Sequence, residues 1–222
     1  MIPKSVHQAA QRLLSAQDAL DAFKASDAAS DVEVARRHWW GFLVGVSGAH
    51  SKLEQGAKCC GRCTAWFGRV KHLRRTDPLL SYLHHARDSD THGLADVTVS
   101  APQGLSINSG GALGLGETGI DFKFKNQDGA EPRAVKITVK DGQGPERDVT
   151  SKVLQTSIDH RLRLVTVTDD RFSDSFNPPT EHLQMQLDDT SPGAVGTLAI
   201  AYMQKLLEEA ESIPCDAQRA PP

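Results

Sequence analysis

The spacing of apolar residues changes once along the chain, near residue 95, and this change sets the fold class. Before that point apolar residues recur every three or four positions, which is the period of an α-helix. After it, the segments 95–100, 120–125, 134–140 and 161–167 alternate between apolar and polar residues, as β-strands do. We therefore predict an α+β protein: an N-terminal four-helix bundle followed by a small antiparallel β-rich domain closed by a C-terminal helix.

The predicted domains follow the same division. Residues 1–95 form the helical bundle, 96–213 the β-rich domain with its helix, and 214–222 a disordered tail. The chain has 222 residues, of which 39% are hydrophobic, enough for one large domain or two small ones with real cores. Ser191 and Pro192 have the pattern of an N-cap and a first helical residue, so they predict the start of the last helix. That helix either covers the sheet or docks on the bundle.

Capping patterns predict where the other helices begin and end. Ser30 and Glu33 have the spacing of a capping box and predict the start of a second helix. A third helix is predicted over residues 58–75. Asp77 followed by Pro78 predicts the start of a fourth helix, which should run to about residue 92.

Turn residues interrupt the second half of the chain. The segments 126–129 and 141–144 are rich in Asn, Asp and Gly and predict the turns of an antiparallel sheet. The glycine-rich segment 109–119 lacks the lysine of a phosphate-binding loop, so we interpret it as a flexible hairpin. Residues 169–184 are interpreted as an irregular surface loop.

Three glycines, Gly41, Gly45 and Gly48, fall on one flank of the predicted second helix. Their missing side chains would let another helix approach closely, although each glycine costs about 1 kcal/mol of helix propensity relative to alanine. The flank therefore predicts either packing inside the bundle or a contact between two copies of the chain.

Charge is divided unevenly along the chain, whose formal net charge is −3. Residues 1–95 carry 13 lysines and arginines against 9 acidic residues, a net of +4, and the remainder carries 12 against 19, a net of −7. On the predicted third helix a basic face is separated from the apolar one, and its members are Lys58, Arg62, Arg69 and His72. Such a face predicts binding of a polyanion such as RNA, and an ordinary solvated helix face is the alternative.

Three of the four cysteines, Cys59, Cys60 and Cys63, lie within five residues of one another, unlike the spaced cysteines of a disulfide framework. The Cys-Gly-Arg-Cys segment could indicate a zinc site or a redox pair. However, no second Cys/His pair follows at ligand spacing, so we predict no metal and no cofactor, and small core residues instead. Free thiols, and the lack of any long apolar run in the sequence, predict a cytoplasmic protein that does not contact a membrane.

The fourth predicted helix ends in the segment Arg-Asp-Ser-Asp-Thr-His, residues 87–92. A helical bundle whose last helix carries an arginine, a polar residue and then a histidine resembles the HEPN superfamily. Its metal-independent ribonuclease members share an Arg–His motif with a gap of four to six residues. The resemblance covers about residues 1–95 and places Arg87, Asp88 and His92 at the motif positions. It implies cleavage of RNA by a homodimer in which two motifs meet in a cleft.

These residue types suit the implied chemistry. The 2′-hydroxyl of RNA can attack the adjacent phosphate, so the protein must supply a proton acceptor or donor and a cation for the developing charge. His92 suits the first role because imidazole titrates near pH 6.5. Arg87 suits the second because it is permanently charged and pairs with phosphate oxygens. Asp88 lies one helical turn before His92, where it would orient the imidazole or secure the helix.

Other interpretations remain open. Arg87 and His92 can instead neutralise the dipole and the last carbonyls at the end of their helix. The chain would then be a non-catalytic dimeric interaction module whose acidic β-rich domain binds a protein partner. In a third interpretation, the acidic half shields or regulates the basic half.

Overall fold

The computed structural model describes residues 1–92, 97–109, 120–122, 137–139, 147–148, 154–168 and 174–214. The chain divides into two compact units, one of Met1–Ala101 with Arg161–Pro222 and one of Pro102–His160. Helices and antiparallel strands are both present, so the predicted α+β class is confirmed. Most of the glycine-rich segment, both predicted turns and the predicted disordered tail lie outside the described residues.

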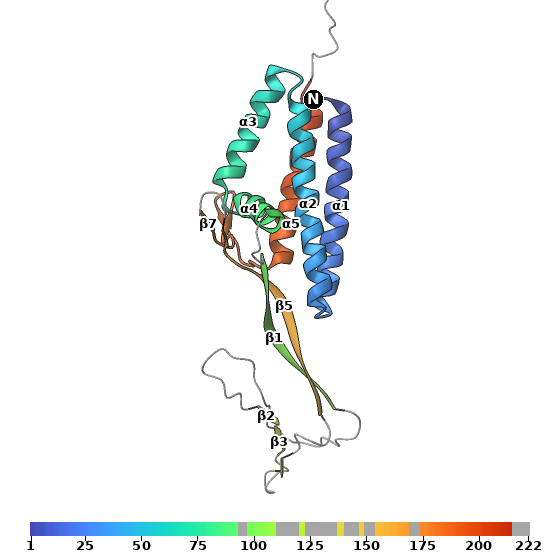
Figure 1. Ribbon diagram of the computed structural model, residues 1–222, viewed down its shortest axis with the longest axis vertical. Helices are drawn as coiled ribbons and strands as arrows, with labels where there is room; N and C mark the ends of the chain where they lie inside the picture. Colours follow the sequence, from blue (N-terminus) through green and yellow to red (C-terminus); the bar gives the residue numbers. More distant parts are fainter. Residues whose placement is uncertain are drawn as a thin grey trace, which may run out of the picture. The chain divides into compact units, whose positions relative to one another are not determined.

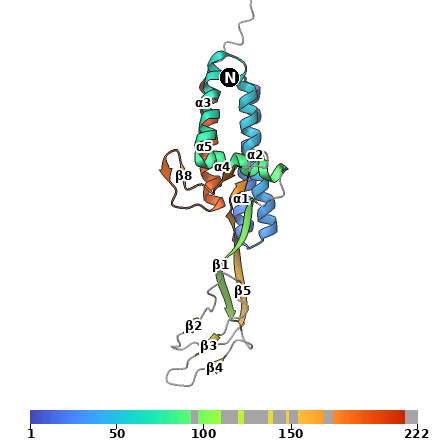
Figure 2. The same ribbon diagram turned by 60° about the vertical axis from the view of Figure 1, so that its left-hand side comes forward.

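The described residues of the first unit form five helices. They are α1 (Pro3–Ala28), α2 (Val32–Ala57), α3 (Gly61–Thr76), α4 (Pro78–His92) and α5 (Pro192–Ser212). The long helices α1, α2 and α5 pack side by side, and α4 lies across them (Figures 1 and 2). In the described part of the chain, every helix is too short or too polar to cross a lipid bilayer.

The last helix docks on the bundle, which was one of its two predicted positions. The buried face of α5 includes Val195, Ala199 and Met203, and the helix packs against α1 and α2. Gly196 lies so close to Leu20 of α1 that a Cβ there would come within 2.5 Å of the leucine side chain. The helical unit is therefore larger than the predicted 1–95 domain, because the apolar face of α5 is buried by the N-terminal helices.

Aromatic side chains fill the centre of this bundle. Trp39 is fully buried, and its ring centroid lies 5.4 Å from that of Phe23 and 4.9 Å from that of Phe42. Burying large side chains of this kind contributes about 1.5–3 kcal/mol each. These contacts join α1 to α2 at the level where α5 also packs.

The glycine flank of α2 faces α1, so these glycines serve packing inside the bundle. A Cβ on Gly41 would lie 3.4 Å from the side chain of Ala19, and one on Gly48 would lie 3.5 Å from Arg12. The approach is closest at Gly45, where a Cβ would lie 2.9 Å from the Cα of Ala16. Only a residue without a side chain allows this crossing.

Of two predicted helix N-caps, one was wrong and one is confirmed. The prediction of Ser30 as the N-cap of α2 was wrong: Asp31 takes that position and accepts a hydrogen bond from the Val34 amide at 3.3 Å. Ser30 lies one residue earlier, in the left-handed region with a φ of 57°. Asp77 does cap α4, where its carboxylate accepts from the Leu80 amide at 2.9 Å.

Short antiparallel ladders follow the helices. In the first unit, β6 (Val167–Thr168) pairs with β7 (Ser175–Phe176), and β8 (Glu181–His182) pairs with β9 (Met185–Gln186). The segment predicted as an irregular loop thus contains paired strands. The strand β1 (Thr98–Ser109) pairs with β5 (Leu154–Leu164).

The second unit contains a three-stranded antiparallel sheet, in which two of the predicted alternating segments, 120–125 and 134–140, contribute the strands β2 (Ile120–Phe122) and β3 (Ile137–Val139). Its strands are β2, β3 and β4 (Arg147–Asp148), in that order. The register pairs Ile120 with Val139 and Phe122 with Ile137. Apolar positions of the two strands therefore lie opposite one another.

Candidate active site

The predicted motif residues lie in the last turns of α4, whose bounds agree with the prediction. Arg87 donates a hydrogen bond from Nη1 to Oδ1 of Asp88 at 2.8 Å, and both side chains are partly exposed. The other carboxylate oxygen of Asp88 lies 3.5 Å from Nδ1 of His84, one turn earlier on the helix. His92 is the last residue of α4, and its side chain lies outside the described part of the chain.

The Asp88 carboxylate therefore holds a cation in place. It bridges Arg87 and His84, which limits the orientations of the guanidinium and leaves part of it accessible to solvent. The predicted alternative role of Asp88 in orienting His92 is not tested by these contacts.

The predicted basic face is exposed. Arg62, Arg69 and His72 are solvent-exposed on α3, while Cys63, Trp66, Phe67 and Val70 bury its other side. The prediction that the third helix begins at residue 58 was wrong, because Cys60 caps α3 and the helix begins at Gly61. Lys58 is exposed but lies at the C-cap of α2, outside this face. The sequence of α3 contains no acidic residue, so no charge within the helix neutralises this face. Separation of the basic and apolar faces is therefore confirmed.

A small cavity lies where α2, α3, α4 and α5 meet. Its volume is about 40 Å³, and its polar lining residues are Ser47, His50, Arg74, His84 and Tyr202. A water molecule needs roughly 10–15 Å³ on this measure, so the cavity has room for two or three waters. Nucleotide-sized ligands occupy pockets of about 300–1,000 Å³, so this cavity is too small to hold a nucleotide.

Both histidines that line the cavity are neutral at pH 7. Burial, reinforced by the Arg74 guanidinium, lowers the pKa of His50 to about 3. The same two causes lower the pKa of His84 to about 4, although the Asp88 carboxylate opposes them. Neither imidazole can therefore donate a proton as an imidazolium near neutral pH.

Hydrogen bonds in the cavity fix the tautomer of His50. Arg74 is a donor at 3.1 Å from Nδ1 of His50, so this nitrogen accepts and Nε2 carries the proton. Among the described residues, neither Nε2 of His50 nor the Tyr202 hydroxyl has a hydrogen-bond partner. Burial also raises the pKa of Tyr202 to about 12, which keeps the phenol protonated. A small polar molecule in the cavity would give these groups partners.

The cavity residues were missed by sequence reasoning. His50 lies on the second helix and Arg74 on the third, 24 residues later, and neither belongs to a recognisable motif. The only signal was that His50 falls at a position where helical spacing expects an apolar residue. That signal identifies a buried histidine but not its partner.

Groups that could hold a metal lie elsewhere in the described structure. The side chains of Cys59, Cys60 and Cys63 converge at the junction of α2 and α3. They lie at the opposite end of α3 from Arg74.

Comparison with protein-family models, curated proteins and solved structures finds no match for this chain. The candidate functions therefore rest on its own residues and on the motif in α4.

Proposed function

We propose that the protein is a cytoplasmic, metal-independent endoribonuclease of HEPN type that acts as a homodimer. The observation that carries this proposal is the partly exposed Arg87 guanidinium, which Asp88 holds at 2.8 Å at the end of α4. A phosphate group that binds at this end of α4 would contact a guanidinium whose position Asp88 already fixes.

Exclusion of the neighbouring histidines supports His92 as the acid–base group. A general acid or base works best when its pKa is near the working pH. His50 and His84, with pKa values lowered to about 3 and about 4, are far from that condition. The His85 ring stacks face to face on the Phe176 ring, with centroids 3.6 Å apart. This contact fixes the position of the His85 imidazole. His92 is the remaining histidine of α4.

The reaction would be a transesterification within the RNA. The 2′-oxygen attacks the adjacent phosphorus while its proton passes to a neutral imidazole. The bond from phosphorus to the 5′-oxygen breaks, and an imidazolium protonates that oxygen. The products are a 2′,3′-cyclic phosphate and a 5′-hydroxyl end. Arg87 would stabilise the additional negative charge on the phosphate oxygens, and two subunits would supply the two imidazoles.

The exposed face of α3 supports RNA as the substrate. Arg62 and Arg69 are exposed there, and Lys58 is exposed at the C-cap of α2; all three can neutralise phosphates of a bound strand. Each contact of this kind adds roughly 0.7 to the slope of log affinity against log salt for a single strand. Alanine at each position should reduce the slope by about that amount.

Cleavage of labelled single-stranded RNA, with no divalent metal added, tests the proposal. Arg87→Ala and His92→Ala should each lower the rate at least about 100-fold, since each removes a group acting in the transition state. Arg37→Ala and His7→Ala are matched controls because both residues are exposed on other helices, and they should cleave normally. The products should carry cyclic phosphate ends.

One result would overturn the proposal. If the purified dimer leaves RNA intact, and the Arg87 and His92 variants differ from it only in stability, the protein is not a nuclease. The non-catalytic interaction module would then be the better interpretation.

A further inference from the structure

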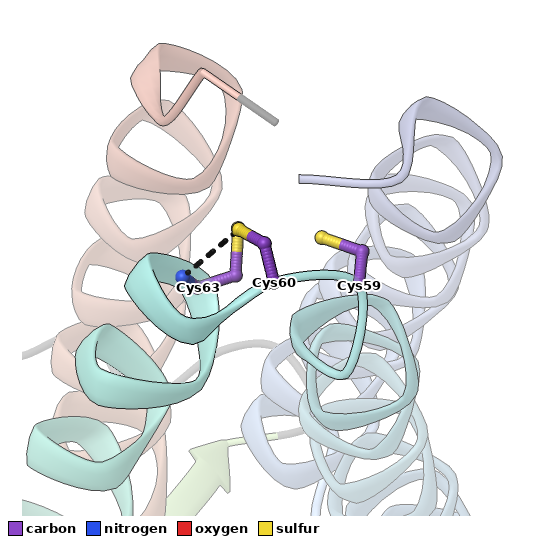
Figure 3. A group of neighbouring side chains, drawn as sticks. All are labelled: Cys59, Cys60 and Cys63. Atoms are coloured by element: carbon purple, nitrogen blue, oxygen red, sulfur yellow. Dashed lines mark hydrogen bonds between the residues drawn. The ribbon is translucent and has the colours of Figure 1, made fainter. Parts of the chain in front are cut away.

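Three cysteines converge at the turn that joins α2 to α3. Cys59 and Cys60 lie in this turn, and Cys63 lies in the first turn of α3. Their sulfur atoms are all within 4.8 Å of one another (Figure 3). The side chains are thiols rather than halves of a disulfide.

Local hydrogen bonds hold this turn in shape. Cys60 is the N-cap of α3, and its Sγ accepts from the Cys63 amide at 3.5 Å. The Thr64 hydroxyl contacts the carbonyls of Ala57 and Cys60, each at 3.1 Å, and so ties the end of α2 to the start of α3.

We propose that Cys59, Cys60 and Cys63 bind one zinc ion at the α2–α3 junction. Zinc binds thiolates at about 2.3 Å with tetrahedral geometry, which places two thiolates roughly 3.8 Å apart. The observed sulfurs need only small side-chain rotations to reach that separation. Soft thiolate ligands also select zinc over magnesium or calcium.

Core packing alone does not explain the cluster. Cys63 is fully buried, as expected for a small core residue, but Cys59 and Cys60 are only partly buried. A redox pair would need only two thiols, but here the sulfur atoms of all three cysteines lie within 4.8 Å of one another. The absence of a second Cys/His pair in the sequence argued against zinc, but Cys59 supplies the third ligand from the adjacent position.

Zinc requires a fourth ligand, which water would supply. Among the described residues, no fourth Cys, His, Asp or Glu lies at the cluster.

The test is metal binding by the full chain, with Zn²⁺ measured against a chromogenic chelator and Co²⁺ used as a spectroscopic probe. One equivalent of either metal should bind, and Co²⁺ should show thiolate-to-metal charge transfer with tetrahedral ligand-field bands. Cys59→Ser and Cys60→Ser should each weaken Zn²⁺ binding at least tenfold. Both side chains are partly exposed, so these variants keep the core intact, and circular dichroism checks this. His7→Ala is the control for adventitious binding by a surface histidine.

The proposal is overturned if Zn²⁺ binding is no tighter than in a Cys59→Ser/Cys60→Ser double variant. It is also overturned if the reduced protein binds no Co²⁺ and mild oxidation joins Cys60 to Cys63, which would indicate a redox pair. RNA cleavage is not a readout, so the zinc and nuclease proposals fail independently.

Discussion

The buried carboxylate of Asp77 should be a main stabilising contact of the helical unit. It is 4% exposed and accepts hydrogen bonds from the Leu80 amide at 2.9 Å and from the Leu183 amide at 2.7 Å. It also contacts Nδ1 of His182 at 3.0 Å. One side chain thus caps α4 and fastens the β8–β9 hairpin to it, so Asp77→Ala should release both.

The expected loss of stability follows from these contacts. Removing an N-cap costs about 1 kcal/mol. Leaving the Leu183 amide and the buried His182 without their acceptor costs about 1–3 kcal/mol for each group. We therefore expect a total of about 3–7 kcal/mol. For a protein of this size the melting temperature should fall by roughly 10–20 °C.

Urea denaturation at pH 7.5, followed by tryptophan fluorescence, measures this loss. Asp31→Ala is the matched control, because Asp31 is an exposed N-cap with a single capping bond of 3.3 Å and should cost about 1 kcal/mol. Asp77→Asn keeps the shape and one acceptor oxygen, so it should fall between the two. If Asp77→Ala costs no more than Asp31→Ala, Asp77 is only a cap and the reasoning about the hairpin is refuted.

Two further predictions concern packing and pH. Gly45→Ala should destabilise the protein by about 1–3 kcal/mol because the new Cβ would meet the backbone of Ala16. Gly68→Ala, with open space around it, should instead stabilise the protein by roughly 0.5–1 kcal/mol. Thermal unfolding measures both, and a change in stability of the same sign for the two variants would contradict this. His50 stays neutral in the fold but gains a proton on unfolding below pH 6.5, so stability should fall by about 1.4 kcal/mol per pH unit between pH 6 and 4. His50→Asn keeps an acceptor for Arg74 without titrating, so urea titrations should show a shallower pH slope; an unchanged slope would contradict the assignment.

Helix boundaries could be predicted where local chemistry specifies them. The pairs Asp77–Pro78 and Ser191–Pro192 each combine a capping side chain with a residue that fits the first helical position, and the structure begins α4 and α5 there. Ser30 and Asp31 are both good capping residues, so the sequence pattern could not decide between them. The positive φ of Ser30 depends on how the chain turns from α1 into α2.

Long-range contacts could not be predicted in the same way. Asp77 meets His182 across 105 positions of the chain, and the segment around His182 had no alternating pattern long enough to indicate a strand. The docking of α5 was left open because an apolar helix face fits a sheet as well as a bundle. Periodicity predicts which residues are buried, but packing partners depend on the whole fold.

The helix α3 runs from the proposed zinc site to the cavity. Its first turn carries Cys63, and Arg62 of the basic face lies between the cysteines of the same turn. Its last turns carry Arg74, which contacts His50 in the cavity beneath α4. Because a helix is stiff, a zinc ion that fixes its first turn would also restrict the direction of Arg62 and Arg69. Bound zinc should therefore favour RNA association through preorganisation of the basic face, even though no metal takes part in the proposed cleavage.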